Sequence, residues 1–247
     1  MAGFAGKSVV VLGASSPIGI GAAVARRFAA EGARVMVAAR RRPGLEALAA
    51  DISGEAFVCD TTDHDTVGAL AAAAVERFGR LNVAVNCVAA GSYGPLSQID
   101  PASTLPAVMT NFVGGLYFIK HMGNAMEPDG AIIMTSSSSV TNNSAGLGVY
   151  ASTKAAINHA IKVAAVEYMA KRLRINAIEM SLVLTESTPR DAFTPEAIEA
   201  FARATPLGRL ATPEDCAEAY LFAAGAFTTG RIIDISGRGT LVKATMG

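Results

Sequence analysis

Short apolar segments alternate with alanine-rich segments of helical periodicity along almost the whole chain. The apolar segments predict strands at Ser8–Leu12, Arg34–Ala39, 56–59, Val83–Asn86, Ala131–Thr135 and 175–180. The periodic segments between strands predict helices at Ile20–Ala30, 45–52, 67–78 and 149–170. Fully apolar strands that alternate with helices are typical of a parallel sheet covered on both faces. We therefore expect an α/β fold with a single doubly wound parallel sheet, a Rossmann fold with helices on both faces.

One long segment, 185–206, interrupts this alternation. It carries Pro189, Pro195 and Pro206 and a short helical piece at 196–204. No linker, repeat or low-complexity segment divides the chain. We therefore expect a single domain over residues 1–247, within which 185–206 forms a substrate-binding loop or lid.

Composition and charge narrow the classes of function. Lys plus Arg and Asp plus Glu number 21 each, so no net charge attracts nucleic acid or an anionic membrane. No apolar run approaches the roughly 18–20 uninterrupted residues of a membrane helix, and residues 1–7 do not resemble a signal peptide. The three cysteines are widely spaced, which suits a reducing compartment. The histidines, His64, His121 and His159, lie at no metal-ligand spacing along the sequence. We expect a cytoplasmic protein without a metal, whose partner is a small molecule.

A glycine-rich turn follows the first predicted strand and opens the first predicted helix. It reads Gly13-Ala14-Ser15-Ser16-Pro17-Ile18-Gly19-Ile20-Gly21. Glycines let a backbone turn sharply and approach a pyrophosphate, which then lies at the helix N-terminus. A plain strand-to-helix turn is the alternative, because Gly and Ser are common in such turns. The position directly after the first strand favours dinucleotide binding.

The second predicted strand ends without the carboxylate that would hold the ribose diol of NAD. It ends at Ala39, and Arg40, Arg41 and Arg42 follow. A guanidinium matches a phosphate in shape and charge. We therefore expect Arg40 and Arg41 to bind a 2′-phosphate, so that NADP(H) is favoured and NAD(H) is possible. A solvated basic turn is the alternative.

Tyr150 and Lys154 stand four residues apart near the start of the helix predicted at 149–170. Positions at this spacing share one helix face. An ammonium there, beside an oxidised nicotinamide, lowers the pKa of a phenol toward working pH, so that the tyrosine can exchange a proton with a carbonyl or an alcohol. The pair alone is common on surface helices. However, the preceding strand ends in four serines, 136–139, whose hydroxyl groups can project into the same crevice.

These motifs, in this order, resemble the short-chain dehydrogenase/reductase family. Gly13, Gly19 and Gly21 match its Gly-x-x-x-Gly-x-Gly when Pro17-Ile18 is taken as a two-residue insertion. The resemblance covers nearly the whole chain, through 206–209 and 213–215 to 234–237. It departs from the family after the sixth strand, where Pro-Gly-x-x-x-Thr keeps only the threonine, Thr185.

The resemblance implies a catalytic set of Ser137, Tyr150, Lys154 and Asn111. The family's serine stands 13 residues before its tyrosine, which selects Ser137, with Ser138 as the alternative. In the family, the residue at the place of Asn111 holds a water that passes protons to the lysine. A purely structural hydrogen bond is the alternative, because an amide inside an apolar helix is costly unless it is paired. The resemblance also implies cofactor contacts from Ser15, Ser16, Ile20, Asp60, Thr61, Asn86, Tyr150, Lys154, Val183 and Thr185.

The prediction from these features is an NAD(P)-dependent oxidoreductase, a ketone reductase or secondary alcohol dehydrogenase. It transfers a hydride between nicotinamide and the carbonyl or alcohol of a mostly apolar small molecule. The expected substrate contacts are Ser137 and Tyr150 with Tyr93, Val140, Leu147, Leu182 and Phe193. The alternatives are a catalytically silent cofactor-sensing or scaffold protein of the same fold, or an epimerase or dehydratase that retains its cofactor. Because the family is usually tetrameric, we expect a homotetramer, with a dimer possible.

Overall fold

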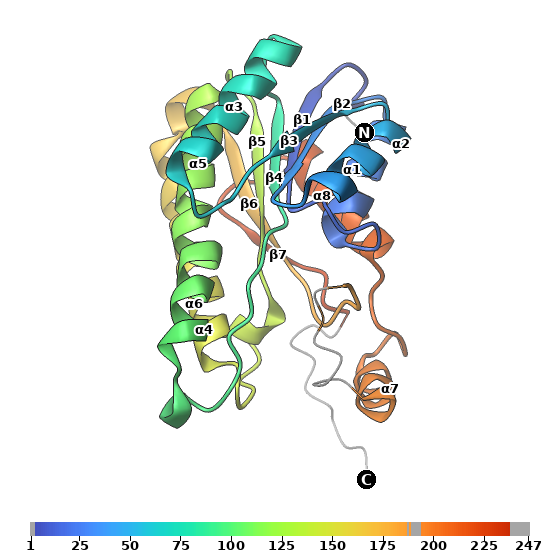
Figure 1. Cartoon of the computed structure of the whole chain (residues 1–247), viewed down its shortest axis with the longest axis vertical. Helices are drawn as coiled ribbons and strands as arrows, with labels where there is room; N and C mark the ends of the chain where they lie inside the picture. The colour runs from blue at the N-terminus through green and yellow to red at the C-terminus, as the bar shows by residue number, and fades with distance from the viewer. Residues whose placement is uncertain (1–2, 187, 189–193, 238–247) are drawn as a thin grey trace.

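The computed structural model describes residues 3–186, 188 and 194–237. Within them, seven strands form one parallel sheet in the order β3-β2-β1-β4-β5-β6-β7, which runs through the middle of the molecule in Figure 1. The strands are β1 (Ser8–Leu12), β2 (Arg34–Ala39), β3 (Glu55–Val58), β4 (Val83–Asn86), β5 (Ala131–Thr135), β6 (Arg174–Glu179) and β7 (Ile232–Asp234). The strand order reverses direction between β1 and β4, and ligands of open parallel sheets bind beyond the carboxyl ends of the strands at such a point.

Helices cover both faces of the sheet (Figure 1). On one face lie α1 (Ile20–Ala30), α2 (Arg42–Asp51) and α8 (Pro213–Gly225), and on the other lie α3 (His64–Phe78), α4 (Pro101–Val108), α5 (Gly114–Ala125) and α6 (Gly148–Glu167). The remaining helices are α7 (Pro195–Ala204) and the short η1 (Leu96–Gln98), η2 (Met109–Val113), η3 (Ser138–Val140) and η4 (Met169–Lys171). This arrangement confirms the prediction of a doubly wound α/β fold.

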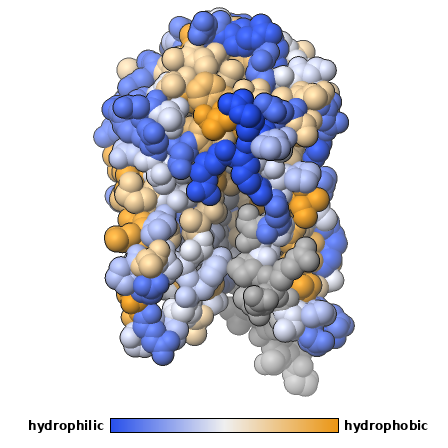
Figure 2. Space-filling view, in the orientation of Figure 1, coloured by the Kyte–Doolittle hydropathy of each residue, from blue (hydrophilic) through white to orange (hydrophobic). Residues whose placement is uncertain are grey.

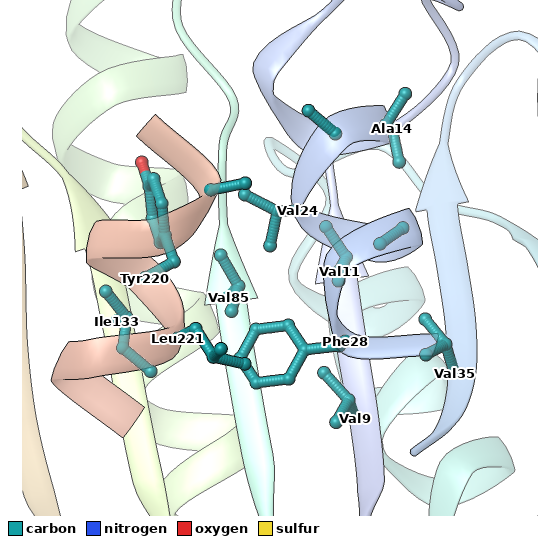
Figure 3. Packing of buried hydrophobic residues seen from close by; sticks show 14 of the residues in the cluster. Val9, Val11, Ala14, Val24, Phe28, Val35, Val85, Ile133, Tyr220 and Leu221 are labelled. Carbon is teal, nitrogen blue, oxygen red and sulfur yellow. The ribbon is translucent and has the colours of Figure 1, made fainter. Parts of the chain in front are cut away.

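Each face of the sheet has its own hydrophobic core. In the core drawn in Figure 3, Phe28 of α1 reaches between Val9 of β1 and Leu221 of α8. Phe28 has no exposed surface, and full burial of such a side chain stabilises the fold by about 1.5–3 kcal/mol. On the opposite face, Phe118 and Met122 of α5 are equally buried. The two cores hold the sheet rigid below the crevice at its carboxyl edge.

The predicted boundaries shift by a few residues where capping decides the helix start. Helix α3 begins at His64 rather than at residue 67, because the Asp63 carboxylate accepts hydrogen bonds from the N–H groups of Asp65 and Thr66. Helix α2 begins at Arg42, three residues earlier than predicted, with a proline in its first turn. Helix α8 and strand β7 were absent from the predicted pattern.

The helical run Pro101–Ala125 was also absent from the predicted helices. It joins α4, the five-residue π-helical turn η2 and α5, and Pro106 lies inside it. By length and composition alone this run is apolar enough to cross a membrane. However, Asn111, Phe118 and Met122 are buried within the protein. The buried residues Phe118 and Met122 belong to the core on this face of the sheet, and 33% of the apolar window of the run is buried.

Candidate active site

The turn after β1 requires glycine at two positions. Gly13 has a φ of +95°, in the left-handed region that favours glycine. A Cβ atom on Gly13 would lie 2.9 Å from the carbonyl carbon of Cys87, and one on Gly21 would lie 2.4 Å from the carbonyl oxygen of Gly13. The start of α1 therefore packs directly against this turn, and the turn against the end of β4.

The N-terminus of α1 is open to an anion. Its N-cap, Gly19, offers no side-chain cap, and the first turn of α1 contains no acidic residue. The first N–H groups and the positive end of the helix dipole are therefore available to a phosphate. The inserted Pro17 and Ile18 form a turn in which Ile18 is exposed. The insertion thus projects at the surface and leaves Gly19 and Gly21 at the helix start, as predicted.

A cleft of about 600 Å³ opens beside this turn, at the carboxyl ends of β1, β2, β3 and β4. Figure 2 shows this face of the molecule with a furrow below a group of strongly hydrophilic residues. The predicted cofactor residues in the walls of the cleft are Gly13, Ser15, Ser16, Arg40, Arg41, Asp60 and Thr61. Sequence reasoning did not assign the other wall residues to the cofactor: Leu12, Ala39, Cys59, residues 87–90, Pro106, Thr110 and Glu186. Most of these directly follow a strand, which is the signal that could have found them.

The side chains of Asp60 and Thr61 differ in their hydrogen bonds to the rest of the protein. The Asp60 carboxylate accepts hydrogen bonds from the N–H and hydroxyl groups of Thr62 at 2.9 and 2.8 Å. The Thr61 hydroxyl, on a residue only 4% exposed, is buried without a hydrogen-bond partner among the described residues. A buried hydroxyl without a partner is costly. This oxygen packs against the start of α5, where a Cβ atom on Gly114 would lie 2.8 Å from it.

The two arginines predicted to recognise a 2′-phosphate differ in their surroundings. Arg40 forms no ion pair with any residue that the structure describes. Arg41 donates from both terminal nitrogens to the Glu186 carboxylate, at 3.0 and 2.9 Å. Glu186 lies 145 residues further along the chain, so no local sequence signal could have found this pair.

Lys154 is buried at the end of β5. Only 2% of its surface is exposed, and its Nζ atom donates to the carbonyl oxygen of Thr135 at 3.0 Å. Nζ also lies 5.8 Å from the centre of the Tyr150 ring. Burial lowers the pKa of Lys154 to about 8, and a smaller electrostatic effect of Cys87 acts in the opposite direction. Tyr150 and Lys154 thus share one helix face, as the sequence predicted.

The pKa of Tyr150 moves in the opposite direction from the one expected beside an ammonium. Burial raises it to about 12, while the hydrogen-bonding Ser137 hydroxyl lowers it and the nearby Tyr93 raises it further. Lys154 does not counter this shift, because its ammonium donates to Thr135 and lies against the phenol ring. In the protein alone, desolvation therefore decides the protonation state of Tyr150.

Among the four serines after β5, Ser137 is the one whose hydroxyl acts on the pKa of Tyr150, which it lowers. Ser137 Oγ also accepts hydrogen bonds from the N–H and hydroxyl groups of Ser139, at 3.2 and 3.0 Å. Ser138, the alternative, is buried, and its N–H donates to the carbonyl oxygen of Met180. This geometry supports the register that selects Ser137.

Asn111 is buried in η2, and its side chain links three segments. Its Oδ1 atom accepts from the N–H of Ala90 at 2.9 Å. Its Nδ2 atom donates to the carbonyl oxygen of Ala90 at 2.8 Å and to Thr153 Oγ1 at 3.0 Å. The amide therefore fastens the cleft wall to the helix that carries Lys154. This structural role was the alternative in the sequence analysis, and the relay role stays a prediction.

Other predicted cofactor residues lie outside the walls of the cleft. Asn86 ends β4, and its Oδ1 atom accepts from the N–H of Val88 at 2.9 Å, which shapes the chain after that strand. Val183 is buried and forms a backbone bridge with Ala211. The N–H of Thr185 donates to Thr188 Oγ1 at 3.0 Å. Gly19, Ile20 and Gly21 form the start of α1.

The predicted substrate residues come from four segments. Tyr93 is half-exposed, and its ring centre lies 6.1 Å from that of Tyr150. Leu147 precedes α6, Val140 ends η3 and Leu182 follows β6, and all three are partly buried. Phe193 lies outside the described residues. Of the predicted substrate residues, Tyr93 therefore lies beside the Tyr150 ring.

Comparisons with known proteins agree with this geometry. Residues 13–237 match the family described as enoyl-(acyl carrier protein) reductase. The chain is 30% identical over 244 residues to the 7alpha-hydroxysteroid dehydrogenase of Escherichia coli (strain K12), which covers 95% of this chain and 94% of that protein. It is 31% identical over 226 residues to the D-threitol dehydrogenase of Mycolicibacterium smegmatis. This alignment covers 89% of this chain and 86% of that protein. The fold matches a short-chain type dehydrogenase/reductase from Mycobacterium ulcerans with a TM-score of 0.89 and 28% identity, over 95% of this chain and 90% of that one.

Proposed function

The chain belongs to the short-chain dehydrogenase/reductase family of NAD(P)(H)-dependent oxidoreductases, and from this premise we propose that it interconverts an alcohol and a carbonyl with Tyr150 as acid/base. One observation carries the proposal. The Ser137 hydroxyl and the Lys154 side chain both lie against Tyr150, at the end of β5. The cleft at the open N-terminus of α1 lies at the same edge of the sheet.

The residues of this cleft fit a nicotinamide dinucleotide. The turn at Gly13 admits a backbone-to-phosphate approach, and the first turn of α1 carries no acidic residue that would repel the phosphate. In the proposal, Gly13, Ser15, Ser16, Gly19, Ile20 and Gly21 hold the pyrophosphate, Asp60, Thr61 and Asn86 the adenosine half, and Tyr150, Lys154, Val183 and Thr185 the nicotinamide half. The bound cofactor supplies or takes up the hydride that is exchanged with the substrate carbon.

The residues around Tyr150 hold the proton that reduction of a carbonyl requires. With a pKa raised to about 12, Tyr150 is protonated at neutral pH and can donate to the substrate oxygen. Ser137 holds that oxygen through its hydroxyl. Lys154, with a pKa of about 8, is mostly charged at pH 7, and its ammonium is held beside the Tyr150 ring by the carbonyl oxygen of Thr135. Asn111 completes the proposed catalytic set.

NADP(H) is the favoured cofactor of the proposal. The end of β2 offers Ala39 in place of a carboxylate, and Arg40 and Arg41 line the cleft directly after it. A guanidinium binds a phosphate with two parallel hydrogen bonds. The ratio of kcat/KM for NADP(H) and NAD(H) tests this preference in the parent protein and in Arg40→Ala. A strong preference of the parent for NAD(H) contradicts it.

The substrate of the proposal is a mostly apolar alcohol or ketone in the space bounded by Tyr93, Val140, Leu147 and Leu182. Large apolar side chains are exposed on the outer helices, among them Leu105 of α4, Val166 of α6 and Phe222 of α8. They support a homotetramer or dimer, which light scattering after gel filtration tests. The three free cysteines suit the proposed cytoplasmic location.

A panel of ketones and alcohols with both cofactors, followed by nicotinamide absorbance, tests the reaction itself. We expect turnover with apolar cyclic or aromatic compounds in preference to sugar alcohols. Cofactor binding without turnover of any compound supports a cofactor-sensing protein instead. Product formation with no net change in absorbance supports an epimerase or dehydratase that retains its cofactor.

A further inference from the structure

Glu186 reaches across the mouth of the cofactor cleft to the arginine that follows β2. Both terminal nitrogens of Arg41 donate to the Glu186 carboxylate, at 3.0 and 2.9 Å, in a two-point pair. The Nε atom of Arg41 donates to Ser15 Oγ at 3.2 Å. All three nitrogens of this guanidinium are therefore engaged by the protein itself.

The carboxylate in this pair is strongly acidic. The pKa of Glu186 is lowered to about 2, first by hydrogen bonding to Arg41 and then by the neighbouring Ser16 hydroxyl. Glu186 is therefore ionised at neutral pH. A permanent negative charge stands where Ser15 and Ser16, two predicted phosphate contacts, meet Arg41.

A carboxylate and a phosphate compete for the same hydrogen-bond donors of a guanidinium. Each binds through two parallel N–H···O bonds to the same edge of the arginine. A 2′-phosphate on a ribose at the end of β2 would therefore need the hydrogen bonds that Glu186 now accepts. It would also meet the like charge of the carboxylate, which disfavours its approach. A ribose with a free 2′-hydroxyl meets neither obstacle.

We propose that Glu186 is a specificity-determining residue that competes with the cofactor 2′-phosphate for Arg41 and so limits the preference for NADP(H) over NAD(H). The inference rests on the proposed function, because it requires a dinucleotide in this cleft. Arg40 lines the same cleft and forms no ion pair with a described residue. Because Glu186 pairs with Arg41 and not with Arg40, Arg40 still attracts a 2′-phosphate. Cofactor choice in this protein then depends on a residue far from the second strand, where the family's selecting carboxylate stands.

Calorimetric titration of the full chain with NADP⁺ and with NAD⁺ tests the proposal without relying on turnover. In Glu186→Gln the carboxylate charge is lost at unchanged side-chain size, and Arg41 becomes available. We expect the Kd for NADP⁺ to fall by about two- to fivefold, the range that an exposed ion pair provides. The Kd for NAD⁺ stays within about twofold.

Glu46→Gln is the matched control, because Glu46 pairs with the adjacent Arg42 at 3.3 Å and lies outside the cleft walls. It removes the same charge from the same region, and we expect both Kd values to stay within about twofold. A double-mutant cycle adds Arg41→Ala: in that background, Glu186→Gln improves NADP⁺ binding by less, because no guanidinium is left to release and only the like-charge repulsion is relieved.

Three results overturn the inference. They are an equal change in both Kd values, an unchanged Kd for NADP⁺ in Glu186→Gln, or the same gain with and without Arg41. An equal weakening of both cofactors would show that Glu186 fastens the cleft closed over any dinucleotide. If the parent binds neither cofactor, the proposed function fails instead, so the two failures are distinguishable.

Discussion

The Nζ atom of Lys154 donates to the carbonyl oxygen of Thr135 at 3.0 Å, and so ties helix α6 to the last residue of β5. The Thr135 hydroxyl in turn donates to the carbonyl oxygen of Asn86 at 2.7 Å and lies 2.6 Å from the hydroxyl of Tyr220. A buried ammonium is thus positioned by a strand end that is itself held by β4 and α8. This network places the Lys154 charge beside Tyr150. The free-energy cost of burying that charge can be measured.

Replacement of Lys154 by Met removes a buried charge, and the effect on stability depends on pH. The pKa of Lys154 is about 8 in the folded protein, below its ordinary value of 10.5. Below pH 8 the ammonium is charged in both states, and the folded protein bears the full cost of burying it. Between about pH 8 and 10.5 the unfolded chain binds more protons, so the stability of the parent rises with pH relative to Lys154→Met.

We expect this relative gain to be on the order of 3 kcal/mol in the free energy of unfolding across that window. Urea unfolding of parent and variant at pH 7.5, 8.5, 9.5 and 10.5 measures it. Lys162→Met, an exposed position on the same helix, is the control and shows no such trend. A difference between parent and Lys154→Met that stays constant with pH contradicts a depressed pKa.

Tyr220→Phe removes the hydroxyl that supports Thr135. The Thr135 hydroxyl donates its hydrogen to Asn86, so the buried Tyr220 is the donor in the 2.6 Å contact. Loss of this hydrogen bond lowers the free energy of unfolding by about 1–2 kcal/mol, measured by urea denaturation. Tyr117→Phe is the control, expected within about 0.5 kcal/mol of the parent. Equal stability of parent and Tyr220→Phe would mean that the contact contributes nothing.

Tyr150→Phe removes the acid/base group and keeps the ring. General acid–base catalysis contributes about 10²–10⁴-fold, so we expect kcat to fall by at least about 100-fold. The Kd of the cofactor stays within about twofold. Tyr168→Phe, at the C-terminal end of the same helix, is the matched control and retains turnover. Parallel loss of turnover and cofactor binding in Tyr150→Phe would point to a structural tyrosine.

Asn111→Ala separates the structural role of this amide from a proton relay. The N–H and carbonyl groups of Ala90 both lose their partner, so we expect the free energy of unfolding to fall by about 1–3 kcal/mol. Because Ala90 lines the cleft, cofactor affinity falls as well. Thermal unfolding and calorimetric titration measure the two effects, with the exposed Asn143→Ala as control. A residue that acts only as a relay loses turnover with unchanged stability.

Local features of the sequence were sufficient for six of the seven strands, for the glycine turn and for the helix face shared by Tyr150 and Lys154. Apolar runs mark buried parallel strands because both faces of such strands are covered. Residues four apart on a helix share a face whatever surrounds them, so Tyr150 and Lys154 could be paired in advance. Gly13 could be placed because a tight turn directly after a strand favours glycine, whose backbone adopts a positive φ without strain. These inferences depend on chain geometry alone; the α/β fold and the family are confirmed, and the roles of the site residues stay predictions.

The tertiary structure alone decided the contacts between distant segments. The sequence analysis found no histidines at metal-ligand spacing, yet the Nε2 atoms of His64 and His121 lie 3.1 Å apart across α3 and α5. Among the described residues, no group of three or more potential metal ligands forms around them. The pairing of Arg41 with Glu186, and the burial that raises the pKa of Tyr150 to about 12, likewise had no local signal. Such contacts follow from strand order and helix packing, which bring remote residues together and remove water from them, and no short stretch of sequence encodes either effect.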